Sequence, residues 1–235
     1  VYDRASEEEL RRMTDSFPDL PSRIRRKLFG RKNLSYRESG VNFDPEVLRR
    51  EPALLEGCFQ SERYFAPAAA RVREAYRFRP EALSLSERSV RLERQLKKAK
   101  HPTVSVHVRR GDYLDSSHGG IYSGICTQDY YERAMRRVRE ELEDAVFYVF
   151  SNDPDWARAH FDQKGCVVPE GGTEAAGYED LYLMSQCQHH IIANSSFSWW
   201  GAWLSENPKK LVIAPDRWLN GTECRDIYTK DMLRI

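Results

Sequence analysis

The chain has 235 residues, of which 40% are hydrophobic and 31% are charged, an ordinary balance for a soluble globular protein. Its 37 lysines and arginines almost match its 36 aspartates and glutamates, and the net charge of +1 argues against bulk binding to nucleic acid. Basic groups are therefore expected to act locally. No apolar stretch approaches the length of a membrane span.

The first hundred residues are predicted to be mostly helical. Ser6 with Glu9 forms a capping box that opens a helix. The basic segment 20–32 has apolar residues at four-residue spacing, a pattern that suits an anionic membrane surface but is more typical of a solvated surface helix. Another charged helix covers 86–100 and ends before a proline. We assign residues 1–100 to the remainder of an N-terminal domain.

From residue 103 short apolar runs alternate with helical segments, which predicts βαβ units and a parallel sheet. The predicted strands are 103–108, 145–150, 165–168, 190–193 and 211–214, and the predicted helices between them are 127–143, 153–161, 178–187 and 197–206. The fold class is therefore α/β. A Rossmann-like domain is expected at 101–219, followed by an irregular tail at 220–235 with room for a short helix.

Cysteine usage indicates a reducing compartment. The five cysteines are odd in number and widely scattered, which suits free thiols better than a disulfide framework. Cys187 lies close to His189 and His190 in the sequence, but no second pair of ligands matches it. We therefore expect no metal site.

Polar turns follow the predicted strands. The first strand ends in Arg109, Arg110 and Gly111, which offer guanidinium forks for phosphate oxygens and a backbone free to turn tightly. The segment 151–154 resembles a helix N-cap followed by proline. The segment 194–198 opens a helix, whose N-terminal amides form an anion-binding cup.

Ordinary surface ion pairs or helix capping would explain any one of these turns. Parallel strands, however, bring their carboxyl ends to one edge of the sheet, where ligands bind in open α/β folds. Two anion-seeking turns on that edge favour a nucleotide diphosphate.

The helices on either side of the fourth strand carry further candidates. Trp199 and Trp203 are four residues apart and are predicted to pack in the core, whereas Trp200 faces elsewhere and either packs or contacts a sugar. Glu179 and Asp180 begin the preceding helix, where carboxylates usually favour the helix dipole. Asp180 is alternatively suited to accept the N1–H and 2-amino hydrogens of guanine.

The chain resembles the bacterial-type α-1,2-fucosyltransferases. The stretch Val106-His107-Val108-Arg109-Arg110-Gly111-Asp112-Tyr113 is similar to the arginine motif of that family. A second signature matches the segments 179–187 and 191–204, and a softer match covers 56–65. Together these motifs extend from about residue 50 onward.

This resemblance implies a two-domain GT-B architecture built from two Rossmann-type domains with parallel sheets. It also implies transfer of L-fucose from GDP-β-L-fucose, with inversion and without a metal or other cofactor, to the 2-hydroxyl of a galactose-terminated glycan. Arg109 would bind the β-phosphate, His107 and Asp180 would hold guanine, and three residues would complete the diphosphate cradle, namely Ser195, Ser196 and Phe197. Tyr113 and Trp200 are the predicted acceptor contacts.

The departure from the family lies at the start of the chain. The family opens with a glycine-rich Gly-Gly-Leu-Gly-Asn-Gln segment that lines the site, and no such segment occurs here. About fifty residues of such an enzyme are therefore expected to be missing, which leaves the first domain incomplete.

The predicted chemistry requires the negative charge on the departing GDP to be neutralised, which we assign mainly to Arg109 and to helix N-terminal amides. Arg110 either assists or pairs with Asp112. The general base stays open between Asp112, Asp115, His118, a group in the missing segment and a donor phosphate oxygen.

Other hypotheses remain. They are a GDP-sugar-binding module without catalysis, and an α-1,6-fucosyltransferase that acts on a glucosamine-containing glycan. Nucleic-acid binding is disfavoured by the charge balance. We expect a bacterial cytoplasmic protein, with peripheral contact to the inner membrane left open, or a Golgi-lumen protein if the source is eukaryotic.

Overall fold

The computed structural model describes residues 4–30, 32, 34–49, 54–79, 83–114, 119–170 and 177–235. The chain divides into two compact units, Val1–Ala66 and Pro67–Ile235. The sequence predicts a boundary after residue 100. It falls earlier because helix α4 (Glu87–Lys98) packs against helix α8 (Gly177–Gln186) and so belongs with the sheet of the second unit.

In its described residues, the first unit holds two short α-helices and a pair of strands. Helix α1 (Glu7–Met13) begins with the predicted capping box, and helix α2 (Leu20–Phe29) starts at the Asp19 cap and ends at Gly30. The apolar positions of α2 are at least half exposed in this structure. The parallel strands β1 (Ser35–Arg37) and β2 (Leu54–Glu56) were not predicted, because three-residue strands carry too little periodicity to be recognised.

Within the described residues, the second unit contains a six-stranded sheet in which every pairing is parallel. The order is β5-β4-β3-β6-β7-β8, which is the Rossmann order 3-2-1-4-5-6 counted from β3. The strands are β3 (Thr103–Val108), β4 (Val146–Ser151), β5 (Cys166–Val167), β6 (His189–Ile191), β7 (Val212–Ala214) and β8 (Met232–Arg234). The predicted parallel α/β class is confirmed.

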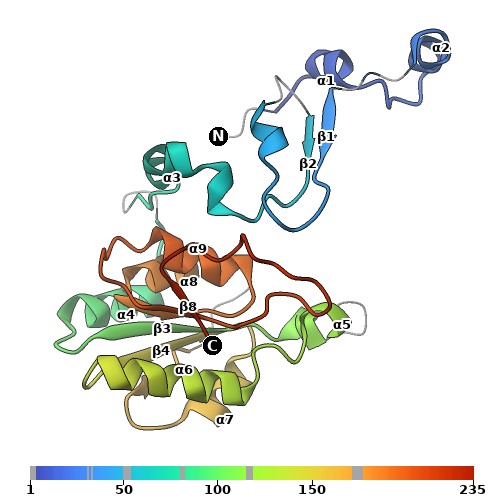
Figure 1. Cartoon of the computed structure of the whole chain (residues 1–235). Helices are drawn as coiled ribbons and strands as arrows, with labels where there is room; N and C mark the ends of the chain where they lie inside the picture. Colours follow the sequence, from blue (N-terminus) through green and yellow to red (C-terminus); the bar gives the residue numbers. More distant parts are fainter. Residues whose placement is uncertain are drawn as a thin grey trace. The chain divides into compact units, whose positions relative to one another are not determined.

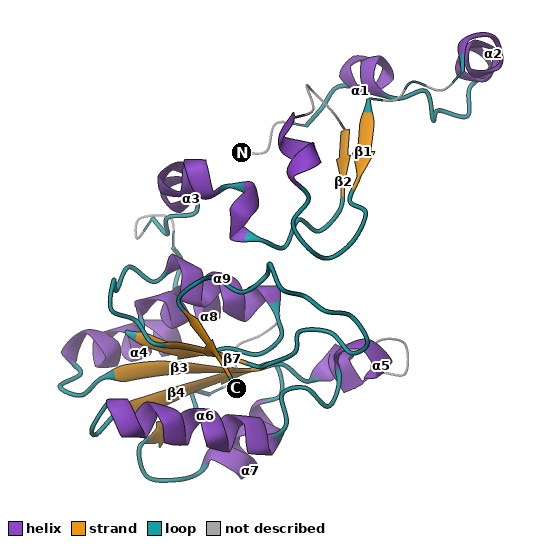
Figure 2. Cartoon of the chain, in the orientation of Figure 1, coloured by secondary structure: helices purple, strands orange, loops and turns teal. Residues whose placement is uncertain are grey.

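Helices cover both faces of this sheet (Figures 1 and 2). Helices α4, α8 and α9 (Ser196–Leu204) lie on one face, and α6 (Gln128–Glu141) and α7 (Pro154–Phe161) lie on the other. Because both faces are covered, all six residues of β3 are buried, including the polar Thr103, Ser105 and His107 that alternate with its three valines. The shorter elements are α3 (Ala69–Ala75), α5 (Gly119–Tyr122) and the 3₁₀ turns η1 (Pro45–Arg49), η2 (Glu62–Tyr64), η3 (Ala66–Ala68) and η4 (Gly111–Leu114).

The C-terminal tail differs from the prediction of an irregular segment. Its last residues form the edge strand β8, which pairs with β7 through Met232, Leu233 and Arg234. The amide of Ile235 also donates to the Ala214 carbonyl oxygen (3.1 Å). This strand forms because β7 lies beside it. Three residues of sequence are too few to predict such a pairing.

The strand order creates a topological switch point between β3 and β6. The chain proceeds from β3 to β4 and β5 on one side, and β6 begins the other half with β7 and β8. Ligands of open α/β sheets bind in the crevice outside the carboxyl ends of the two strands at such a point. The turns that follow β3 and β6 are the two for which the sequence predicts anion binding.

Candidate functional site

A tyrosine joins the two turns at the switch point. Strands β3 and β6 pair directly, with Val106 opposite Ile191, so the turns that follow them start side by side. The hydroxyl of Tyr113, in the turn after β3, donates to the carbonyl oxygen of Asn194, after β6 (3.0 Å). Burial raises the pKa of Tyr113 to about 12, so this hydroxyl stays protonated and remains a donor. The arginine turn and the serine turn therefore form one continuous edge.

Arg109 is oriented but retains free donors. Its Nε lies 2.9 Å from Oδ1 of Asp112, and its guanidinium carbon lies 5.7 Å from the centre of the Tyr113 ring. Among the described residues, no acceptor lies against its two Nη groups, and about a third of the side chain is exposed. Asp112 therefore holds Arg109 in place through Nε and leaves the two Nη groups of the guanidinium for a ligand.

Arg110 has a different role. Its Nε donates to Oδ2 of Asp153 (3.1 Å), its guanidinium lies 4.2 Å from the centre of the Trp156 ring, and its backbone amide donates to Oδ1 of Asn152. The alternative in which Arg110 pairs with Asp112 is wrong, because the pairing partner of Asp112 is Arg109. Arg110 instead ties the first turn to the turn after β4.

Gly111 is required at this turn for two physical reasons. Its φ of +41° lies in the left-handed region that side chains disfavour. A Cβ at this position would also lie 2.5 Å from Nδ2 of Asn152, closer than atoms can approach. The close contact between the two loops thus depends on the missing side chain.

The start of α9 differs from the start of α7. Asp153 caps α7 by accepting the amide of Trp156 (3.1 Å), whereas Ser195 makes no such bond at the N-cap of α9. Helical geometry leaves the first amides of a helix without an intrahelical acceptor. Capping alone explains the turn after β4, but it does not explain the serines at the start of α9, where the amides of residues 196–198 stay available to an anion.

Asn194 clamps the same turn from behind. Its side-chain amide donates to the carbonyl oxygens of Tyr122 (3.2 Å) and Trp218 (3.1 Å). The sequence motif contained this asparagine, yet the prediction gave it no role. The only signal in the sequence was an asparagine directly after a predicted strand. That position does not reveal which loops the side chain joins.

His107 and Phe197 connect β3 to α9. The imidazole is 4% exposed, and its centre lies 5.3 Å from that of the Phe197 ring. Burial, and then the charge of Arg109, lowers the pKa of His107 to about 3, so the ring is neutral near pH 7. Its Nδ1 is buried, and no hydrogen-bond partner for it lies within the described part of the chain. The same Phe197 ring lies next to Gly177, at the start of α8.

Two adjacent carboxylates at the start of α8 bind different partners. Glu179 accepts hydrogen bonds from the amide (3.1 Å) and hydroxyl (2.6 Å) of Ser86, at the N-terminus of α4. Asp180 pairs with Arg88, whose Nη1 lies 2.9 Å from Oδ1. Since α4 and α8 both precede strands of a parallel sheet, these N-termini lie at the same edge as the arginine turn.

The tryptophans behave largely as predicted. Trp199 and Trp203 are buried, with ring planes 8° apart and centres 6.1 Å apart. Trp200 is half-buried, meets Trp203 edge-on and stacks on Tyr76 at 5.2 Å. An acceptor contact at Trp200 stays a prediction. Two candidate bases, Asp115 and His118, lie outside the described residues.

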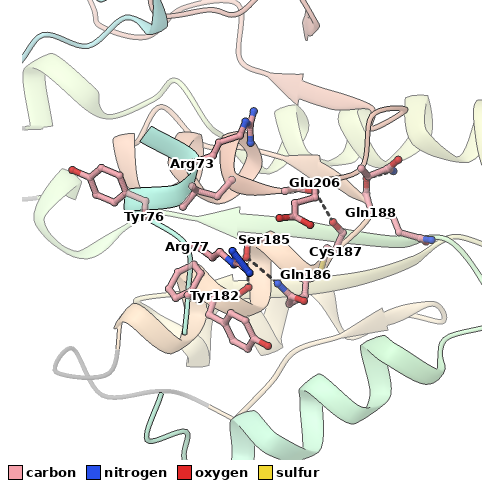
Figure 3. Close-up of a pocket in the computed structure, with 13 residues that line it drawn as sticks. Arg73, Tyr76, Arg77, Tyr182, Ser185, Gln186, Cys187, Gln188 and Glu206 are labelled. Carbon is pink, nitrogen blue, oxygen red and sulfur yellow. Dashed lines mark hydrogen bonds between the residues drawn. The ribbon is translucent and has the colours of Figure 1, made fainter. Parts of the chain in front are cut away.

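A separate hollow of about 360 Å³ lies at the opposite edge of the sheet (Figure 3). Its lining includes Arg73, Tyr76 and Arg77 on one side and Ser185 and Gln186 on the other. Because α8 ends at Gln186 and β6 begins at His189, this hollow faces the amino ends of the strands. It is therefore not part of the switch-point site.

No three histidine, cysteine, aspartate or glutamate side chains of the described ranges converge in a way that could hold a metal ion. No helix within the same ranges is long and apolar enough to span a bilayer. Independence of the chemistry from metal stays a prediction.

The fold and the turns define a Rossmann-like α/β protein with a candidate anion site at its switch point. Residues 52–232 match the family described as Glycosyl transferase family 11, and the chain belongs to this family. The resemblance inferred from the motifs is thereby confirmed.

Three relatives illustrate the range of the family. The chain is 40% identical over 120 residues to the O-antigen biosynthesis glycosyltransferase WbnK of Escherichia coli, covering 51% of this chain and 40% of that protein. It is 37% identical over 172 residues to the alpha-1,2-colitosyltransferase of Escherichia coli, covering 71% of this chain and 56% of that protein. It is 39% identical over 104 residues to the galactoside alpha-(1,2)-fucosyltransferase 1 of Ateles belzebuth, covering 43% of this chain and 28% of that protein. The chain thus spans about half, or less, of the length of these relatives.

Proposed function

We propose that this chain carries the GDP-sugar-binding part of an enzyme that transfers L-fucose from GDP-β-L-fucose to the 2-hydroxyl of a galactoside. The observation that carries the proposal is the single edge at which Arg109, with unused donors, adjoins the uncapped N-terminus of α9. A guanidinium fork and the free amides of a helix N-terminus both suit the phosphate oxygens of a pyrophosphate. The motifs and the membership in Glycosyl transferase family 11 support the same conclusion.

In the proposed reaction the acceptor oxygen attacks the anomeric carbon as the bond to the β-phosphate breaks. The bonding electrons leave with GDP, and the acceptor proton passes to a base. Attack from the face opposite GDP gives inversion. Arg109 and the amides of residues 196–198 would stabilise the charge that develops on the phosphate, so that no metal or other cofactor is needed.

The role of each remaining residue follows from its contacts. Asp112 would orient Arg109 and is committed to that pair, which makes a donor phosphate oxygen or a group outside the described residues the better base. Ser195 and Ser196 would complete the phosphate cradle, while Phe197 would press on the neutral His107 beside the base of the nucleotide. Tyr113, through its hydrogen bond to the Asn194 carbonyl oxygen, would keep the two turns of the phosphate cradle together. It would also face the acceptor.

The proposed architecture is GT-B, with residues 67–235 as the donor domain and the earlier residues as part of an acceptor-side domain. A cytoplasmic location, with peripheral contact to a membrane, belongs to the same proposal. Neither placement is needed for the donor chemistry.

A second donor deserves an experiment of its own, because one bacterial relative is named as an alpha-1,2-colitosyltransferase and aligns with 71% of the chain. Colitose lacks the 3-hydroxyl that fucose carries, so the two GDP-sugars share the diphosphate and the guanine and differ at one group of the sugar. The switch-point site would bind both.

The test combines binding with product analysis. Calorimetric titration of the protein with GDP, GMP, UDP and ADP should give the tightest binding for GDP, because both phosphates and guanine are recognised. Incubation with GDP-fucose or GDP-colitose and with lactose or N-acetyllactosamine should give an α-1,2 linkage by NMR.

Each other outcome has a definite meaning. Binding of GDP without any transfer by the full-length protein would favour a non-catalytic module, and an α-1,6 linkage to a glucosamine-containing acceptor would favour an α-1,6-fucosyltransferase. Equal affinity for all four nucleotides would overturn the proposal.

A further inference from the structure

Arg88 is placed where helix electrostatics disfavour it. It is the second residue of α4, after the Ser86 cap and Glu87, and the amino end of a helix carries partial positive charge. Its Nε is also buried and has no hydrogen-bond partner among the described residues, which is costly for a charged group. Neither feature stabilises α4. The contact of Arg88 with Asp180 is the interaction that offsets both costs.

The pair of Arg88 and Asp180 is enclosed but incomplete. The two side chains are 15% and 17% exposed, and Nη1 lies 2.9 Å from Oδ1. Among the described residues, no donor faces the other carboxylate oxygen, Oδ2, and this oxygen is not among the enclosed polar atoms. One oxygen of Asp180 is thus anchored, and the other is open to a ligand that brings a donor.

The neighbouring groups fix this arrangement. Glu179 is occupied by Ser86 and Ser89, so it locks the start of α4 to the start of α8 and has no capacity for a ligand. Burial raises the pKa of Asp180, and the adjacent Glu179 adds to this, whereas the charge of Arg88 opposes both. Helix α9, which also packs against α8, contributes no charged side chain within Ser196–Leu204. Arg88 is therefore the described cation that keeps this carboxylate ionised.

We propose that Arg88 is a specificity-determining positioning residue, which holds Asp180 in a fixed orientation and in its charged form so that the carboxylate can select guanine over other bases. The inference rests on the proposed GDP-sugar donor. Ionised carboxylate oxygens accept the N1–H and 2-amino hydrogens of guanine, and Oδ1 keeps a lone pair for this purpose while it is bound to Arg88. Adenine and uracil present no such pair of adjacent donors.

The diagnostic experiment compares GDP with inosine diphosphate, which lacks only the 2-amino group. Dissociation constants are measured between pH 5 and pH 8 for the wild type, Arg88→Met, Arg88→Lys and Asp180→Asn. The ratio of the two constants cancels the ionisation of the phosphates, which both ligands share. Thermal unfolding of each variant checks the fold, and Arg88→Lys keeps the cation if Arg88→Met does not fold.

In the wild type we expect GDP to bind about tenfold or more tightly than inosine diphosphate across this range, as for a hydrogen bond to a charged group. In Arg88→Met the preference should remain at pH 8 and disappear as the pH falls, because the raised pKa of Asp180 lets the carboxyl take up a proton. Arg88→Lys should restore the preference for GDP at the acidic end of the pH range. Asp180→Asn should lose the preference at every pH.

The results that overturn the inference are separate from those that overturn the proposed function. A wild-type preference for GDP that Arg88→Met retains at pH 5 means that Arg88 does not act through Asp180. A preference that Arg88→Met loses equally at every pH means that Arg88 is only a structural support. Failure of the wild type to bind GDP at all removes the proposed donor instead.

Discussion

Gly111→Ala tests whether the arginine turn is held by a close contact with the turn after β4. An alanine at φ +41° adopts a left-handed conformation at a cost of about 1–2 kcal/mol. Its Cβ would meet Nδ2 of Asn152 at 2.5 Å, and moving Asn152 breaks the bond from the Arg110 amide to Oδ1 (2.9 Å), worth about 0.5–1.5 kcal/mol. The variant should lose about 1.5–3.5 kcal/mol of unfolding free energy. At about 2–4 °C per kcal/mol, Tm should fall by roughly 3–14 °C.

Two variants separate the backbone cost from the contact. Gly221 also has a positive φ, +71°, but a Cβ there meets nothing within 4 Å, so Gly221→Ala should show the conformational cost alone. In an Asn152→Ala background, the cost of Gly111→Ala should fall to that of Gly221→Ala. Thermal and urea unfolding, followed by circular dichroism, measure all four. If Gly111→Ala costs no more than Gly221→Ala, or costs the same in both backgrounds, the two turns are not in the contact described here.

Three further predictions concern the same edge. Arg109→Gln should weaken GDP binding about ten- to hundredfold with little change in Tm, whereas Arg110→Gln should lower Tm by a few degrees and leave GDP binding almost unchanged, because Arg109 pairs within its own turn whereas Arg110 ties that turn to Asp153 and the Trp156 ring; the reverse pattern would exchange their roles. The pKa of His107, about 3 in the folded state, lies below its unfolded value, so the unfolded chain takes up the proton first and stability should fall with pH from about 6.5 toward 3. The stability difference between wild type and His107→Gln should therefore shrink as the pH falls in urea titrations, and a constant difference would contradict a buried neutral imidazole. Asp153→Ala should cost about 1–2 kcal/mol through loss of the α7 cap, while Ser195→Ala should cost less than about 0.5 kcal/mol and weaken GDP binding, and equal losses of stability would show that Ser195 is a cap after all.

The functional turns were visible in the sequence because each has a local cause. Arg109 and Gly111 follow a buried apolar run, and Ser195 follows another, so the end of a strand and the start of a helix could both be recognised. Pairings across the fold were less accessible. Asp112 is only two residues from Arg110 in the sequence, yet Arg110 pairs with Asp153. The turn after β4, which carries Asp153, is distant in the sequence but lies beside Arg110 in the folded chain.

Arg88 illustrates the same limit at longer range. Its sequence signal was weak, a cation in the first turn of a helix, where the dipole disfavours it. Only the packing of α4 against α8 shows that this cation lies beside Asp180, ninety-two positions further along the chain.

The sequence by itself determined the parallel α/β class, the bounds of β3 and of the main helices, and the family to which the chain belongs. These features follow from short-range periodicity, from capping residues and from motifs that are contiguous in the chain. Tertiary structure alone decided the strand order, the edge strand β8, the membership of α4 in the second unit and the division of labour between the two arginines. Those features depend on which segments pack against each other. The free energy of these tertiary contacts comes from residues that are far apart in the sequence, so no local pattern reveals it.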